Sequence, residues 1–251
     1  KYKLKDLIDL ENFEISHVNK ILSLSKKYPN KIIRVKMSNF FGGNRYKQKN
    51  FLKCKKNFIT KLRKVTPILE KNNCQIAIEN HQDLSSLEII EIIKNLKSKK
   101  IGINWDIGNS LATCETPDQF FKNTKKYILN VHCKNYKIIL SDKGFFLKRC
   151  VIDEGSINIM KYLKFFRKKN INLSLELAAH VNRHCDFKDK KFLKSHKIDK
   201  KKFHIFKKYI EKNAFTDTPF SKWEQYKKID LSAINELNEF NQSLIKILRY
   251  E

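Results

Sequence analysis

The chain has 251 residues, of which 53 are basic and 26 acidic, and it carries a formal net charge of +27 at pH 7. It contains no run of 18 apolar residues, so we expect no transmembrane helix. Its six cysteines show no C-x-x-C spacing, so we expect reduced thiols in a cytoplasmic protein. Only seven of the basic residues are Arg, the residue suited to bidentate phosphate and guanine contacts, so the charge indicates a Lys-rich solvated surface rather than a nucleic-acid site.

The amino-terminal part of the chain gives two clear elements. Residues 1–30 are hard to assign, apart from a helix that Ser16 can cap. A strand is predicted over 31–37, and a long helix with regularly spaced apolar residues over 51–71. Pro67 lies inside that helical pattern, so we expect it to kink the helix or to begin a second segment.

From residue 75 onward, predicted strands and helices alternate. Short apolar runs bounded by polar residues predict strands over 75–79, 101–106, 127–132 and 171–177. Capping patterns predict that helices begin near Ser85, Thr116 and Ser156. The longer interval before the last strand accommodates a predicted hairpin of 137–140 and 145–150. This alternation argues for a parallel sheet with helical crossovers.

The last part of the chain, 178–251, is predicted to form an enlarged loop or lid and a closing helix. Apolar spacing indicates a helix near 203–210 and a final helix over 231–249. The final helix is expected to bury Ile234, Leu237, Leu244, Ile247 and Leu248. The composition of this part does not indicate a second domain, so we treat 1–251 as a single α/β domain.

The number of predicted strands is too small for the sheet to close into a barrel. A closed (β/α)8 barrel suits a domain of this length but needs eight strands. The sequence shows five, and residues 1–30 can supply at most one more. We therefore expect that the amino-terminal strands of such a barrel are missing from this sequence, which leaves an open sheet edge.

Four of the predicted strands end on a residue that can bind a hard metal ion. Glu79, Asp106, His132 and Glu176 follow one another at intervals of 27, 26 and 44 residues, and the hairpin accounts for the longer interval. Parallel strands joined by helices place their carboxyl ends on one face, where barrel enzymes build their active sites. Carboxylate oxygens with one imidazole suit a single divalent ion, Mn or Mg first and Co or Zn as alternatives.

The chain resembles the sugar phosphate isomerase/epimerase family, which has a xylose-isomerase-like TIM barrel and belongs to the AP endonuclease family 2 superfamily. The matching segments are Ile78-Glu79-Asn80-His81, Trp105-Asp106-Ile107-Gly108-Asn109, Val131-His132-Cys133-Lys134-Asn135, Asp153-Glu154-Gly155-Ser156-Ile157 and Ser174-Leu175-Glu176. The resemblance implies one divalent metal ion held by Glu79, Asp106, His132 and Glu176. Asn135 departs from the family pattern, which often has Asp there.

The resemblance also implies roles in proton transfer and substrate binding. Moving a carbonyl, or inverting the carbon beside it, requires a Lewis acid and two groups that remove and return a proton. Glu79 and Glu176 take the proton-transfer roles, with a sugar or sugar phosphate as substrate. The candidate substrate-binding residues are His81, Asn109, Lys134 and Arg183.

Three other functions stay open at this point. A dehydratase would use the same enediolate chemistry with a different leaving group. An apurinic endonuclease-like phosphodiesterase would suit the positive charge, but it would call for further metal-binding histidines, and Asn109 stands where one is expected. A non-catalytic or truncated relic is the third, and a homo-oligomer is compatible with all of them.

Overall fold

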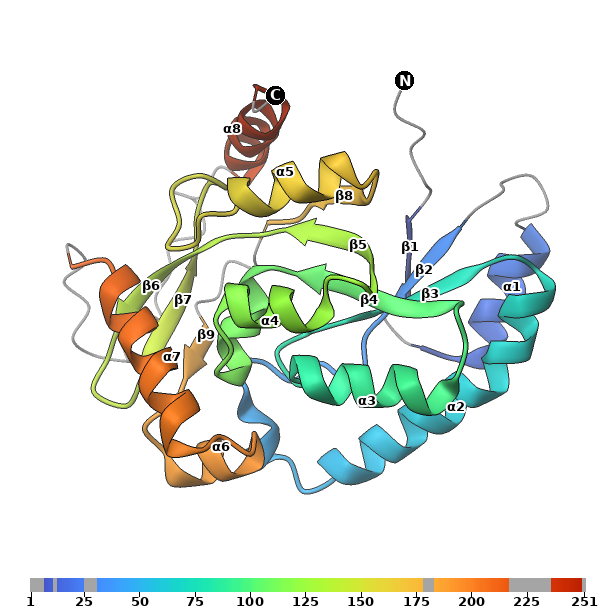
Figure 1. Ribbon diagram of the computed structural model, residues 1–251, viewed down its shortest axis with the longest axis horizontal. Coiled ribbons are helices and arrows are strands. Elements are labelled where there is room, and N and C mark those ends of the chain that lie inside the picture. Colours follow the sequence, from blue (N-terminus) through green and yellow to red (C-terminus); the bar gives the residue numbers. More distant parts are fainter. Residues whose placement is uncertain (1–6, 11–12, 25–30, 178–182, 217–235, 250–251) are drawn as a thin grey trace.

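The computed structural model describes residues 7–10, 13–24, 31–177, 183–216 and 236–249 (Figure 1). Its centre is a six-stranded sheet in which every neighbouring pair is parallel. In spatial order the strands are β1 (Leu7–Leu10), β2 (Ile32–Val35), β3 (Gln75–Glu79), β4 (Ile101–Asp106), β5 (Ile128–Cys133) and β8 (Asn172–Leu175). The predicted parallel α/β architecture is confirmed. The sixth strand is β1, from the segment that the sequence left unassigned.

The connections between these strands are helical. They comprise α1 (Ile15–Leu24), the 3-10 helix η2 (Asn44–Lys47), α2 (Phe51–Lys71), α3 (Ser86–Leu96), the 3-10 helix η3 (Gly108–Thr113), α4 (Pro117–Thr124) and α5 (Met160–Lys168). Ser85 and Thr116 form the predicted capping boxes of α3 and α4. Helix α2 is one element with Pro67 inside it, so the alternative of a second segment is wrong.

The predicted cap at Ser156 is also wrong. Helix α5 begins at Met160, and Ile159 at its start makes no side-chain capping bond. The Ser156 hydroxyl instead accepts a hydrogen bond from the backbone N–H of Ile138 at 2.9 Å, and its own N–H donates to Tyr136 O at 2.8 Å. A serine hydroxyl can accept a hydrogen bond from a backbone N–H of a helix end or of a strand. Sequence spacing alone therefore does not distinguish a helix cap from a contact with a neighbouring strand.

The predicted hairpin is confirmed and forms part of a larger layer. Strands β6 (Tyr136–Leu140) and β7 (Phe145–Arg149) pair antiparallel, and β7 also pairs with β9 (Arg183–Cys185). This packing requires a glycine at position 144, because a Cβ there would lie 1.9 Å from Cys185 O. The segment predicted as a loop or lid therefore contains an ordered strand, followed by α6 (Lys190–Ser195) and α7 (Lys200–Asn213) (Figure 1).

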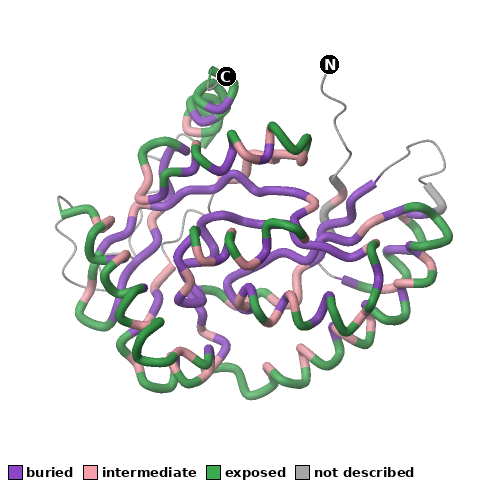
Figure 2. Tube along the Cα trace, in the orientation of Figure 1, coloured by how far each residue is buried: buried purple, intermediate pink, exposed green. Residues whose placement is uncertain are grey.

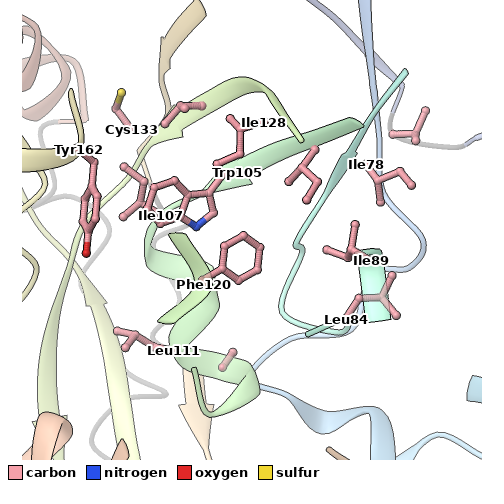
Figure 3. Close-up of a cluster of buried hydrophobic side chains, with 14 of the residues drawn as sticks. Ile78, Leu84, Ile89, Trp105, Ile107, Leu111, Phe120, Ile128, Cys133 and Tyr162 are labelled. Atoms are coloured by element: carbon pink, nitrogen blue, oxygen red, sulfur yellow. The ribbon is translucent and has the colours of Figure 1, made fainter. Parts of the chain in front are cut away.

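The apolar faces of these elements form one large core. Figure 2 shows the central strands buried and the outer sides of the helices exposed. Trp105 of β4 lies fully buried in this core, stacked on Phe120 with ring centroids 5.7 Å apart and edge-on to Tyr162 at 4.9 Å (Figure 3). The rings pack α4 and α5 against the strand that ends at Asp106, so the core holds that strand end in place.

The closing helix α8 (Glu236–Arg249) is present, but the prediction of its buried side is mostly wrong. Leu237 and Leu248 are 70% and 61% exposed, and of the described residues of α8 only Ser243 and Ile247 are buried. Ser243 Oγ accepts a hydrogen bond from Ile152 N at 3.1 Å. The helix thus docks through a narrow polar and apolar edge rather than through its widest apolar face. Ile234 lies outside the described residues.

His196 supports a pH prediction for the folded state. Its ring lies against Phe192, its Nε2 is 3.0 Å from Gly43 O, and burial followed by the nearby Arg45 charge lowers its pKa from 6.5 to about 3. The unfolded chain takes up this proton near pH 6.5 and the folded chain does not, so folding stability falls as pH drops from there toward about 3. Going from about pH 7 to about pH 5 should cost about 2 kcal/mol through this group.

Urea unfolding at the two pH values tests this expectation. The variant His196→Gln should show a smaller loss of unfolding free energy than the parent chain, because Gln does not titrate. His204→Gln, on the exposed side of α7, is the matched control and should keep the parent's pH dependence. Equal pH dependence in all three proteins would contradict the assignment to His196.

Two smaller findings concern composition. Among the described helices, none is both long and apolar enough to cross a membrane. All six cysteines are free thiols, as predicted, and all but Cys54 are buried. The cytoplasmic location stays a prediction.

Candidate metal centre

Strand register brings the four predicted ligands to one side of the sheet. Asp106 of β4 and His132 of β5 are direct cross-strand partners. Glu79 pairs with Asn104, two residues before Asp106, and His132 pairs with Ser174, two residues before Glu176. Side chains two residues apart on a strand point to the same face. All four side chains therefore lie on the same face, near the carboxyl ends of adjacent strands.

Asn80 fixes the end of β3 against the end of β4. Its Nδ2 donates to Asp106 O at 2.9 Å, and its Oδ1 accepts from Asp106 N at 2.8 Å. The side-chain amide thus continues the strand pairing by one step beyond Glu79. Asn80 is buried, so these two hydrogen bonds also satisfy polar groups that would otherwise be costly to bury.

The geometry of the four side chains suits one cation. Glu79, Asp106, His132 and Glu176 each offer a ligand atom, and these atoms all lie within 4.8 Å of one another. Ligands on opposite sides of an ion, with bonds of about 2.1–2.4 Å, are about 4.2–4.8 Å apart. Glu79 Oε1 and Asp106 Oδ1 are buried and have no hydrogen-bond partner in the described part of the chain. Unsatisfied buried carboxylate oxygens fit a site built for a divalent ion.

Two basic side chains share the buried carboxylates. Arg34 of β2 places Nε 2.7 Å from Glu79 Oε2. Lys134 Nζ lies 2.6 Å from Asp106 Oδ2 and 2.7 Å from Glu176 Oε1, and its side chain is 3% exposed. Because the two cations contact the carboxylates directly, they neutralise part of the negative charge of the cluster.

The two outer carboxylates differ in their protonation. Burial, followed by repulsion from Asp106, raises the pKa of Glu79 to about 7. Burial alone would also raise the pKa of Glu176, but the Lys134 ammonium and the hydrogen bond from His132 outweigh it and hold that pKa well below its usual range. One carboxyl group can thus exchange a proton near neutral pH while the other stays ionised.

The two inner groups show the same opposition of burial and charge. Burial raises the pKa of Asp106 despite the nearby Lys134. Burial alone would lower the pKa of His132, but the carboxylates around it, beginning with that of Glu176 at its Nδ1, outweigh burial and raise it. Binding of a metal ion to the imidazole would require loss of that extra proton.

Asn109 lies behind the cluster and is fully buried. Its Nδ2 donates to Asp106 Oδ2 at 2.6 Å, while its Oδ1 accepts from Gln82 Nε2 at 2.8 Å and from Tyr136 OH at 3.0 Å. Both ends of the amide contact protein groups, which hold Asp106 in position. The predicted contact between Asn109 and substrate stays a prediction.

His81 and Arg183 lie at the rim of the cluster. Both contact the side chain of Phe41, with the Arg183 guanidinium 4.1 Å from its ring centroid and the His81 ring centroid 5.3 Å away. Burial, followed by the Lys36 charge, lowers the pKa of His81 to about 3, which keeps its imidazole neutral. The structure thus brings together these two predicted substrate-binding residues, which are 102 positions apart in the chain.

Sequence reasoning missed several residues of this region. The predicted strand over 31–37 contains Arg34, and a charge inside the apolar run Ile32-Ile33-Arg34-Val35 is the signal for its buried partner. Gln82, Phe41 and Tyr136 carried no pattern of their own. They reach the site only because β3, β6 and the loop before η2 meet in space.

Comparisons with known proteins agree with this architecture. Residues 9–196 match the family described as xylose isomerase-like TIM barrel. The 3-oxo-isoapionate decarboxylase of Pectobacterium atrosepticum is 25% identical over 119 residues, 46% of this chain and 43% of that protein. The chain thus aligns with less than half the length of this curated relative.

Solved structures show a likeness of fold only. A xylose isomerase domain protein from Planctomyces limnophilus is 14% identical, with a TM-score of 0.48 over 64% of this chain and 57% of that one. The IOLI protein, solved with a zinc atom, is 12% identical, with a TM-score of 0.43 over 84% of this chain and 76% of that one. Because the family match covers most of its length, the chain belongs to the xylose isomerase-like TIM-barrel family.

Proposed function

We propose that the protein is a divalent-metal-dependent isomerase or epimerase of a small sugar or sugar phosphate. The observation that carries the proposal is the convergence of Glu79, Asp106, His132 and Glu176 within 4.8 Å on the carboxyl ends of adjacent parallel strands. These four residues would hold one ion, Mn or Mg first. When bound, that ion supplies Lewis-acid stabilisation of the negative charge that develops on a carbonyl oxygen.

The two outer carboxylates are placed to move the proton. Glu176 would accept a proton from the carbon next to the carbonyl. Glu79, which lies across the cluster from Glu176 at the end of a different strand, would return the proton. Asp106 would act as a ligand held by Asn109, and His132 as a ligand held by its contact with Glu176.

The proposal is tested by proton exchange at carbon. The metal-free chain is reloaded with Mn²⁺ and incubated with candidate ketoses and their phosphates in deuterated water, and deuterium at the carbon next to the carbonyl is followed by NMR. Glu176→Gln should lower the exchange rate by about 100-fold or more, the usual contribution of a positioned acid or base. Glu154→Gln, a matched change at an exposed side chain, should leave the rate unchanged.

The metal content and the product separate the remaining functions. One ion per chain with exchange supports the proposal, and one ion with loss of water indicates a dehydratase. The decarboxylase among the relatives makes release of carbon dioxide a further product to measure. Two or three ions per chain would indicate the phosphodiesterase, and none would indicate a relic. Exchange that is equal in the parent and in Glu176→Gln would refute the role of Glu176.

A further inference from the structure

The rim of the cluster contains two polar groups without partners. Arg183 Nη1 and His81 Nδ1 are both buried, and neither has a hydrogen-bond partner in the described part of the chain. His81 is only 7% exposed, so water does not readily replace a partner at its ring. Buried polar groups in folded proteins are almost always satisfied, and a pair that is not indicates a place where a ligand supplies the missing contacts.

The packing around Phe41 orders these two groups. The Arg183 guanidinium lies over the Phe41 ring, and the His81 ring packs against the same side chain. A guanidinium that stacks on an aromatic ring still has its N–H donors in the guanidinium plane, where they can hydrogen-bond to a ligand at its edge. The site is therefore formed by strand β9 on one side and by the loop after β3 on the other, which the two sheets bring together.

The surroundings of these groups are positively charged. The charged side chains that act most strongly on His81 are all cations, namely Lys36, Arg183, Lys134 and Arg34. The acid nearest to Arg183 along β9 is already engaged, since Asp186 pairs with His184 Nδ1 at 2.5 Å and with Lys47 Nζ at 2.6 Å. An anion bound at the Arg183 guanidinium on the side of His81 would therefore meet cations, with Asp186 engaged by its own partners.

Arg183 belongs to the small sheet that also contributes Tyr136 to the candidate metal centre, since β9 pairs with β7 and β7 pairs with β6. The Tyr136 hydroxyl donates to Asn109, which in turn donates to Asp106. Resting on the proposed function, we propose that the substrate carries an anionic group, a phosphate or a carboxylate, which Arg183 binds through its free N–H edge while His81 contributes a hydrogen bond. Arg183 would then determine specificity for charged over neutral sugars.

Phosphate binding to the metal-free protein tests the inference without catalysis. Isothermal titration in buffer with EDTA at low ionic strength should show one phosphate site per chain. Arg183→Gln should weaken that site by about tenfold or more, because a charge-assisted contact is lost. Lys143→Gln removes the same charge from the exposed hairpin turn and should change the affinity by no more than about twofold.

Further variants separate recognition from general charge and from misfolding. Arg183→Lys keeps the charge but loses the planar fork, so it should fall between the parent and Arg183→Gln. If Arg183→Gln does not fold, as judged by its melting temperature, His81→Leu is the substitute and should also weaken the site. Equal loss in Arg183→Gln and Lys143→Gln, or no phosphate site in the parent chain, would overturn the inference.

Two further measurements identify the anionic group that binds and test the proposed function independently. Glycolate in place of phosphate tests a carboxylate, and neutral ethylene glycol should not bind. Mn²⁺ titration followed by electron paramagnetic resonance should give the same affinity in Arg183→Gln as in the parent. If Mn²⁺ fails to bind while phosphate binding still depends on Arg183, the proposed function fails and the anion site stands. If Mn²⁺ binds while phosphate binding does not depend on Arg183, the anion site fails and the proposed function stands.

Discussion

Replacing Lys134 by Met should destabilise the metal-free protein by about 3–5 kcal/mol, the usual cost of breaking a buried ion pair from one side. Lys134 Nζ lies 2.6 Å from Asp106 and 2.7 Å from Glu176 and is almost fully buried. Without it, the buried carboxylates lose one of their two cations and repel one another. Urea unfolding in the presence of EDTA measures the loss.

The same substitution should strengthen metal binding by about tenfold or more, since a divalent ion would no longer face a unit positive charge a few ångströms away. Saturating Mn²⁺ should then restore much of the lost stability, because only the folded state binds the ion. Lys137→Met, at a partly exposed position of β6, is the matched control and should change neither quantity appreciably. Weaker Mn²⁺ binding in Lys134→Met would mean that Lys134 organises the site instead of competing for it.

Replacing Trp105 by Ala should lower the free energy of unfolding by about 3–5 kcal/mol, the range for removing a large buried aromatic side chain. Trp105 is fully buried and contacts four rings, those of Phe120, Phe121, Tyr162 and Phe166. The cavity would open between β4 and the helices α4 and α5. Thermal and urea unfolding of the purified variant measure the effect.

The effect should reach the metal centre because Trp105 precedes Asp106 on the same strand. We expect weaker Mn²⁺ binding in Trp105→Ala, and recovery of most of the stability in Trp105→Phe, which refills part of the cavity. Leu87→Ala is the control, since Leu87 is 56% exposed on α3 and should cost less than about 0.5 kcal/mol. A cost in Trp105→Ala as small as in Leu87→Ala would contradict the assigned role of the ring cluster.

The parallel architecture and the four candidate ligands could be predicted from local patterns. Buried parallel strands appear as short apolar runs, and Glu79, Asp106, His132 and Glu176 each stand at the end of such a run. The spacing between runs predicted the crossovers, and polar residues at strand ends predicted the site. Strand β1 was beyond this reasoning, because a four-residue strand in a mixed segment carries little periodicity.

The errors arose where one pattern permits two placements. The closing helix α8 has apolar residues on more than one side, and the helix packs through Ser243 and Ile247 instead of the face with the most leucines. Ser156 can satisfy a helix end or a strand, and it satisfies β6. Choosing between such placements requires knowing which neighbour is present, and that is a non-local property of the fold.

Local runs of side chains predict which residues stand at the carboxyl ends of the strands, because strand length and apolar patterning are local properties. The surroundings of these residues come from packing between distant segments: Lys134 contacts two of the carboxylates, Arg34 pairs with Glu79, and Arg183 and His81 both contact Phe41. These contacts join residues from separate strands and loops, so they depend on strand register and on the packing of one sheet against another. No local pattern contains that information.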